Sequence, residues 1–266
     1  MLPANNIDDY ILFRFRRIDK HFLQSLVNSE LHFARPEALN DPFDCRVDFR
    51  ASLERAIIRA EGANQETLKE LRRIMNEDVR SDEIRAFVEN IGVCSFSLTL
   101  ENTLMWSHYA DNHRGVCLTY GFPKAFFDET VNDILGIVKV DYGPDPLSDW
   151  FLHILDESVS LDRFIRLLIK KAFTVKAELW RHEEEARIVR KTAGIQSIDR
   201  NFLKQVCFGL ATPDADIALV KNIIARCGYD VALCRMRRNE ASDFGLEPIE
   251  IEPSATRERQ VDNCET

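Results

Sequence analysis

The sequence lacks the common signatures of several enzyme classes. It holds no P-loop, no GxGxxG run, no GxSxG elbow and no HExxH pair, so the usual nucleotide-binding, esterase and metalloprotease motifs are absent. The seven cysteines include no CxxC pair, so neither a zinc knuckle nor a redox pair is indicated, and their odd number argues against a secreted disulfide framework. No run of about 18 apolar residues is present to cross a membrane.

Basic residues are also scarce relative to acidic ones. With 35 Lys and Arg against 44 Asp and Glu, the net charge of −9 argues against general binding of nucleic acid or of an anionic membrane surface. The first residues, MLPANNIDDY, lack the basic and apolar segments of a signal peptide, so we expect a cytoplasmic protein.

What is present indicates a globular α+β fold. Residues 10–17 (YILFRFRR) and 91–99 (IGVCSFSLT) alternate in the period of a strand, and so do GVCLTYGF, GIVKVDYG, FLKQVCFGL, DVALCRMRR and EPIEIEP. Residues 147–180 and DADIALVKNIIARCG have helical patterns. We expect one domain over 1–253 with a helical insertion at about 51–90, and a flexible tail over 254–266. The predicted architecture is a split or strongly bent, mostly antiparallel sheet surrounded by helices.

The run LWRHEEEARIVR contains three consecutive glutamates, which on a helix would form a solvated face. A helix needs its apolar stripe to continue, and the glutamates interrupt it. A strand beginning near Arg181 would instead point Glu183, Glu185 and Arg187 to one side, because strand side chains alternate. We therefore expect Glu183 and Glu185 to face a cleft, Arg187 to keep them ionised, and Glu184 to be dispensable.

Two other predicted strands carry polar pairs backed by apolar residues. Arg14 and Arg16 share one face in LFRFR, and Ser95 and Ser97 share one face in CSFSL. If the three strands are adjacent, their polar faces line one groove.

Such a groove suits NAD. Arginine can hold a pyrophosphate by paired charge-assisted hydrogen bonds, and serine can position a ribose or a carboxylate. A glutamate near the ribose can stabilise the positive charge that develops as a glycosidic bond breaks. The sequence therefore predicts NAD as a substrate that loses nicotinamide, and it predicts no metal.

The run LMWSHYADNH adds three candidates. Trp106 and His108 have the flat rings and polar tips that stack on or hydrogen-bond a nucleotide, and Tyr109 is grouped with them. The helical spacing of Met105 and Tyr109 is also typical of a core face. His108 and His113 are five residues apart, off a common helix face, so we do not expect them to share a metal ion.

The run LNDPFDC indicates a turn around Pro42. In the simpler interpretation, Asn40 and Asp44 bond the backbone of their own turn. In the alternative, Asp41 or Asp44 faces the groove as an acid or a metal ligand.

Three motifs resemble those of a widespread bacterial family of domains of unknown function. They are FARPEALNDPFD (33–44), CSFSLTLENTLMWSHYADNHRGVCLTYGF (94–122) and WRHEEEAR (180–187). The family carries a corresponding "fNDPfD" turn, "SFS…MWxxYA…G" and "W.yE.EwR". The resemblance identifies a family and implies no activity.

A second resemblance does imply an activity. An arginine on the first strand, Ser-x-Ser on a middle strand and Glu-x-Glu on a later strand are similar to the arginine-serine-glutamate signature of ADP-ribosyltransferases. By that resemblance Arg14 binds NAD, Ser95 supports the site, Glu185 is the catalytic glutamate and Glu183 helps to activate an acceptor. The run SFS lacks the central threonine of that signature, and the segment from Ser97 to the glutamates is longer than that fold normally needs.

We therefore expect a NAD-using ADP-ribosyltransferase or NAD glycohydrolase with a macromolecular acceptor, of the kind found in bacterial toxins and in defence against phage. Two alternatives stay open. One is an inactive module that senses a nucleotide or binds a protein. The other is a metal-dependent nuclease or hydrolase that uses Asp41, Asp44 and the glutamates.

Overall fold

A computed structural model describes residues 9–46, 48–77, 88–128, 133–154 and 161–252. Its strands are β1 (Asp9–Arg16), β2 (Glu30–Phe33), β3 (Gly92–Ser97), β4 (Val116–Pro123), β5 (Ile134–Lys139), β6 (Asp141–Gly143), β7 (Val175–Ala177), β8 (Glu185–Arg190), β9 (Gly194–Ser197), β10 (Leu203–Phe208), β11 (Ala232–Arg238) and β12 (Leu246–Glu250). Its α-helices are α1 (Lys20–Asn28), α2 (Phe49–Arg59), α3 (Gly62–Glu77), α5 (Thr103–Tyr109), α6 (Pro146–Ile154), α7 (Leu161–Ala172) and α8 (Asp214–Arg226). Short 3-10 helices are η1 (Pro36–Ala38), η2 (Lys124–Phe127), η3 (Glu178–Glu183) and η4 (Arg200–Phe202).

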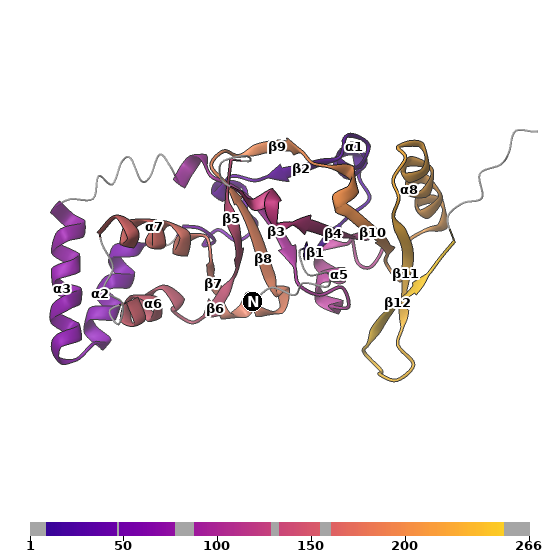
Figure 1. Cartoon of the computed structure of the whole chain (residues 1–266). Coiled ribbons are helices and arrows are strands. Elements are labelled where there is room, and N and C mark those ends of the chain that lie inside the picture. Colours follow the sequence, from indigo (N-terminus) through magenta and orange to yellow (C-terminus); the bar gives the residue numbers. More distant parts are fainter. Residues whose placement is uncertain (1–8, 47, 78–87, 129–132, 155–160, 253–266) are drawn as a thin grey trace, which may run out of the picture.

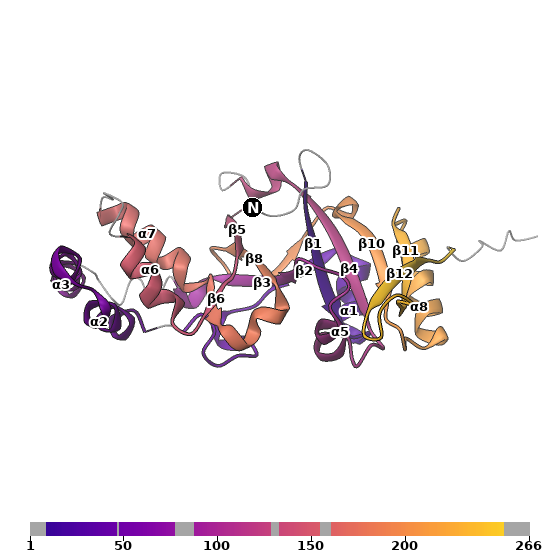
Figure 2. The ribbon, with the colours of Figure 1, turned by 90° about the horizontal axis from the view of Figure 1, so that it is seen from below.

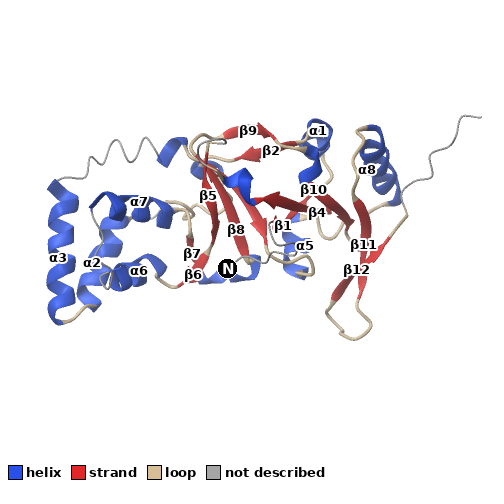
Figure 3. Ribbon diagram, in the orientation of Figure 1, coloured by secondary structure: helices blue, strands red, loops and turns tan. Residues whose placement is uncertain are grey.

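Eight strands form one curled sheet in the order β12-β11-β10-β4-β1-β3-β8-β5 (Figures 1 and 3). All neighbours are antiparallel except β10 and β11, which are parallel. The mixed α+β class and the mostly antiparallel sheet predicted from the sequence are confirmed. The predicted helical insertion contains α2 and α3, while residues 78–87 and the predicted tail lie outside the described residues.

The sheet is almost divided between β1 and β3. Strands β1 and β4 are aligned over their full length, from Asp9 opposite Pro123 to Arg16 opposite Val116. Strands β1 and β3, in contrast, share one aligned pair, Phe13 with Ser97. In Figure 2, β1 and β4 accordingly run at a steep angle to β3. The strands diverge on either side of that single pair, and the divergence leaves room for a cavity.

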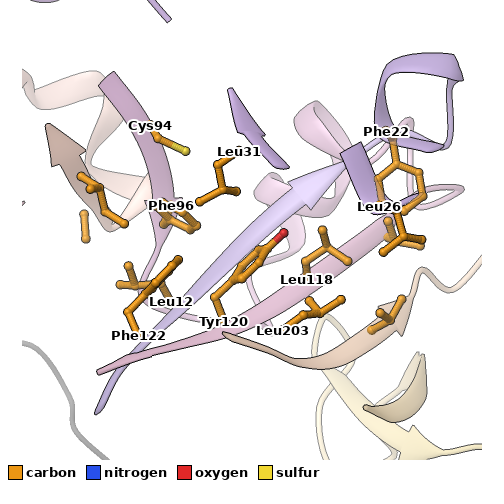
Figure 4. Close-up of a cluster of buried hydrophobic side chains, with 14 of the residues drawn as sticks. Leu12, Phe22, Leu26, Leu31, Cys94, Phe96, Leu118, Tyr120, Phe122 and Leu203 are labelled. Carbon is orange, nitrogen blue, oxygen red and sulfur yellow. The ribbon is translucent and has the colours of Figure 1, made fainter. Parts of the chain in front are cut away.

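The two faces of the sheet are covered differently. One face packs an apolar cluster that includes Leu12, Phe96 and Phe122 beneath α1 and α8 (Figure 4). On the other face, α5 packs Trp106 and Met105 against Phe15 of β1. The cleft residues described below therefore lie between two packed layers.

Four helices, α2, α3, α6 and α7, gather beyond β5, at the left of Figure 1. They share their own apolar cluster, which includes Leu53, Leu68, Phe151 and Phe164. No helix in the described part of the chain is both long and apolar enough to span a bilayer.

Local chemistry fixes α5 beside β1. The side chain of Asn102 accepts hydrogen bonds from the backbone amides of Leu104 and Met105, as an N-cap does. Gly115 follows the helix and passes so close to β1 that an added Cβ would lie 2.2 Å from the Arg16 carbonyl oxygen. Only glycine permits this approach, which brings Tyr109 to the edge of the split.

Candidate functional site

A cavity of about 240 Å³ lies at the split between β1 and β3. Seven of the nine residues predicted for the site line it, and Asn40, Asp44, Lys176 and His32 also contribute. The seven are Arg14, Arg16, Ser95, Ser97, Tyr109, Glu183 and Glu185. These seven residues come from four separate segments, namely β1, β3, α5 and the turn from η3 to β8.

The polar pairs of the adjacent strands β1, β3 and β8 line this one cavity, although they do not all point to one face of the sheet. Residues directly opposite each other on paired strands point to the same face, and Phe13 lies opposite Ser97. Ser95 and Ser97 therefore share the face of Phe13, and Arg14 points to the opposite face, where its guanidinium lies 5.7 Å from the Phe96 ring centre. The arginines reach the same cavity only because the strands diverge.

The arginine end of the cavity is cationic. Among the residues that the structure describes, neither Arg14 nor Arg16 forms an ion pair with a carboxylate. Burial and the neighbouring Arg14 charge lower the pKa of Arg16, and Asp19 opposes this effect. Arginine stays charged at neutral pH all the same, so this end of the cavity suits an anion that can accept hydrogen bonds from a guanidinium.

A second charged group, which we call the ion cluster, consists of Asp44, Lys176, Glu183, Glu185 and Arg187, of which all but Arg187 line the cavity. Each of the five is almost completely buried. Arg187 donates to both oxygens of Asp44 (2.8 and 2.6 Å) and to both oxygens of Glu185 (2.8 Å each). Lys176 Nζ lies between Glu183, Glu185 (3.1 Å) and Asp44 (3.5 Å).

Three carboxylates share two cations in the ion cluster, which leaves an excess of one negative charge beside the cavity. Burial alone raises the pKa of the Glu185 carboxyl, but the Arg187 and Lys176 charges and the Ser95 hydroxyl lower it to about 2. Burial disfavours the charged form of Lys176, yet the adjacent glutamates raise its pKa. The excess charge suits a ligand group that is cationic or becomes so.

The glutamates meet in a way that differs from the expected strand. Strand β8 begins at Glu185, not near Arg181, and Glu183 ends the 3-10 helix η3. Between them, exposed Glu184 has left-handed backbone angles (φ 43°, ψ 52°). This turn brings both flanking carboxylates to Lys176, whereas Glu184 is exposed to solvent.

Two predicted nucleotide-binding residues do not line the cavity. Trp106 is fully buried, its Nε1 donates to the Leu100 carbonyl (2.8 Å), and its ring packs edge-on against Phe15. It is a core residue, since nothing can stack on it. His108 is exposed on the outer side of α5, with its ring centre 6.1 Å from that of His182.

The NDPFD turn joins the cavity in an unexpected way. Asp41, not Asn40 or Asp44, bonds its own turn by accepting from the Phe43 amide (2.9 Å). Asn40 Nδ2 donates to the Tyr109 hydroxyl (2.9 Å), and Asp44 binds Arg187. Asp44 therefore lines the cavity, as the second interpretation expected. Both of its carboxylate oxygens, however, are already bound to Arg187 or close to Lys176. No group of three potential metal ligands was found among the described residues.

Sequence reasoning missed Lys176 and Tyr142. Lys176 lay in a segment that we expected to be helical, but residues 175–177 form β7 beside β6. Tyr142 accepts a hydrogen bond from the Glu185 amide through its hydroxyl (2.8 Å). The signal for Lys176 was one lysine in the otherwise apolar run AFTVKA, which is unusual for a buried strand unless a carboxylate is near.

Residues 105–188 match a protein family of unknown function, DUF2971. This agrees with the resemblance to an uncharacterised family. The matched segment contains Tyr109 and four members of the ion cluster, and it leaves out Asp44, the β1 arginines and the β3 serines. No curated protein and no solved structure matches the chain.

Proposed function

We propose that the protein is a NAD-using ADP-ribosyltransferase or NAD glycohydrolase. The observation that carries the proposal is the charge pattern of one cavity. Arg14 and Arg16 line it without an ion pair to any carboxylate in the described part of the chain, and the ion cluster that also lines it has an excess of carboxylate. NAD has the complementary pattern, with an anionic pyrophosphate and a cationic nicotinamide riboside. The split sheet and the arginine, serine and glutamate residues add support through their similarity to ADP-ribosyltransferases.

In the proposed reaction, Arg14 and Arg16 bind the pyrophosphate, and the carboxylate end receives the nicotinamide ribose. The bond between the ribose anomeric carbon and the nicotinamide nitrogen breaks, and its electron pair leaves with the neutral nicotinamide. The ribose becomes oxocarbenium-like, and the net negative charge of the ion cluster stabilises it. Water or an acceptor nucleophile then bonds to the anomeric carbon and loses a proton.

The cavity size limits what is enclosed. At about 240 Å³ it is smaller than the roughly 300–1,000 Å³ of most small-molecule sites. Only the ribose and phosphate part of the dinucleotide would be enclosed, and the adenosine would extend toward solvent.

The test is incubation of the purified protein with NAD, followed by chromatography for nicotinamide and calorimetry for binding. Arg14→Ala should weaken NAD binding by about 10- to 100-fold, the value of hydrogen bonds to a charged group. Arg237→Ala is the matched control, because this exposed arginine pairs with Glu247 on β12, away from the cavity. NAD that is neither bound nor cleaved by the wild type would end the proposal.

A nucleotide-sensing module is the second candidate. It is favoured by the ion cluster itself, in which each carboxylate already binds a cation. In this case calorimetry would show NAD or a related nucleotide bound, and chromatography would show it intact.

A further inference from the structure

Glu183 and Glu185 cannot be told apart by accessibility. Their exposed fractions are 4% and 3%, and both line the cavity. They differ in how many hydrogen-bond acceptor positions are already used. An ionised carboxylate has about four lone-pair positions for donors, so counting the donors on each glutamate shows which one can still bind a ligand.

Glu185 has three of its acceptor positions filled by direct hydrogen bonds from buried cations. Oε1 accepts from Arg187 Nε, and Oε2 accepts from both Arg187 Nη2 and Lys176 Nζ. The Ser95 hydroxyl also stabilises the ionised form. A ligand hydroxyl at Glu185 would have to compete with these donors for the one remaining position.

Glu183 uses about half of its hydrogen-bond acceptor positions. Within the described residues, Oε1 accepts only from the Tyr109 hydroxyl and Oε2 accepts only from Lys176 Nζ, so one position is left on each oxygen. Tyr109 is itself held in place, because its hydroxyl oxygen accepts from Asn40 Nδ2 (2.9 Å) and its single proton is directed to Glu183. Burial raises the pKa of Tyr109, so that the hydroxyl remains a donor at neutral pH.

We propose that Glu183 is the carboxylate that contacts the ligand, that Tyr109 and Asn40 are its positioning residues, and that Glu185 holds the site together through Arg187. This reverses the roles expected from the ADP-ribosyltransferase resemblance. The proposal rests on the proposed function only for the identity of the ligand group, which is a ribose hydroxyl of NAD.

The first experiment compares Glu183→Gln with Glu185→Gln, each by thermal unfolding and by nicotinamide release. Glu183→Gln should keep the melting temperature within a few degrees and lower release by about 100-fold or more. Glu185→Gln leaves Arg187 without one of its two buried partners, and we expect a melting temperature roughly 6–20 °C lower. A stable Glu185→Gln protein that is inactive, beside an active Glu183→Gln protein, would overturn the assignment.

The second experiment keeps the proposal testable if Glu185→Gln does not fold. Tyr109→Phe removes a donor to Glu183, and Tyr142→Phe removes the acceptor that the Glu185 amide uses. Tyr109→Phe should lower kcat about tenfold with little change in NAD affinity, and Tyr142→Phe should leave kcat nearly unchanged. The opposite order would refute the assignment.

Failure of the proposed function is recognised separately. If the wild type neither binds nor cleaves NAD, the ligand is wrong, and the thermal comparison of the two glutamine variants still tests the roles. Equal destabilisation by Glu183→Gln and Glu185→Gln would then reject the structural role given to Glu185.

Discussion

Arg187 and Ile188 are consecutive in β8, both are fully buried, and they face opposite sides of one sheet. Ile188 lies in the apolar cluster of Figure 4, on the same face as Cys94 and Phe96. Arg187 lies in the ion cluster and makes four hydrogen bonds to two carboxylates.

The difference lies in what makes each burial favourable. Burial of an apolar side chain is favourable with any apolar neighbours, because apolar surface leaves water. A buried charge is stable only when it has a partner of opposite charge and its hydrogen bonds are satisfied. The ion-cluster face should therefore respond strongly to the loss of one partner and to pH. The apolar face should respond to side-chain volume alone.

The largest effect should come from Arg187→Met. The variant leaves Asp44 and Glu185 buried without their guanidinium, which typically costs about 3–5 kcal/mol of the free energy of unfolding. Urea unfolding at pH 7 measures it. A cost below about 1 kcal/mol would mean that Lys176 alone can neutralise the carboxylates.

Acid should have the next largest effect. The folded-state pKa of Glu185 is lowered from 4.5 to about 2, so its stabilising contribution is complete above pH 4.5 and is lost as the pH falls toward 2. At about 1.4 kcal/mol per pKa unit, the loss is on the order of 3 kcal/mol. Urea unfolding of the wild type from pH 5 to pH 2.5 should show this loss of stability. If Glu185→Gln had the same pH dependence as the wild type, the loss could not be assigned to Glu185.

Ile188→Val tests the apolar face. It should cost about 0.5–1.5 kcal/mol, the usual result of removing one buried methylene group. The cost should be the same at pH 5 and pH 3, because the charged groups near its neighbours Phe96 and Cys94 are Arg14 and Arg16, which stay charged at both pH values. A pH-dependent cost would show that the two faces are coupled through β8.

Glu184→Gln should have the smallest effect. The residue lies between the two cluster glutamates but points to solvent, so stability should change by no more than about 0.5 kcal/mol. Any release of nicotinamide should also be unchanged. If Glu184→Gln lowered nicotinamide release as much as Glu183→Gln, the total negative charge of residues 183–185 would matter more than the position of each carboxylate.

The fold could be predicted where its causes are local. Alternation identified β1, β3 and β4. The beginning of β8 was wrong because the left-handed Glu184 breaks the alternation, and no neighbour in sequence requires that conformation. The turn brings both flanking carboxylates to Lys176, a contact that the alternation pattern does not contain.

The candidate site was predictable as a set of residues but not as an arrangement. Alternation pairs Arg14 with Arg16 and Ser95 with Ser97, yet it does not say which face each pair takes. The register of Phe13 opposite Ser97 decides that, and register depends on the partner strand. Trp106 was misassigned because a tryptophan in a short helix has the same pattern in a core as in a binding wall.

Asp44 and Arg187 are 143 residues apart in sequence, and their hydrogen bonds join the NDPFD turn to the far half of the sheet. Contacts between residues far apart in sequence form late in folding, because closing the long loop between them reduces the conformational entropy of the chain before the contact stabilises it. We therefore expect the ion cluster to assemble after the folding transition state. Substitutions there should accelerate unfolding and leave the folding rate almost unchanged. The ion cluster would then determine the kinetic stability of the protein, because its contacts set the rate of unfolding.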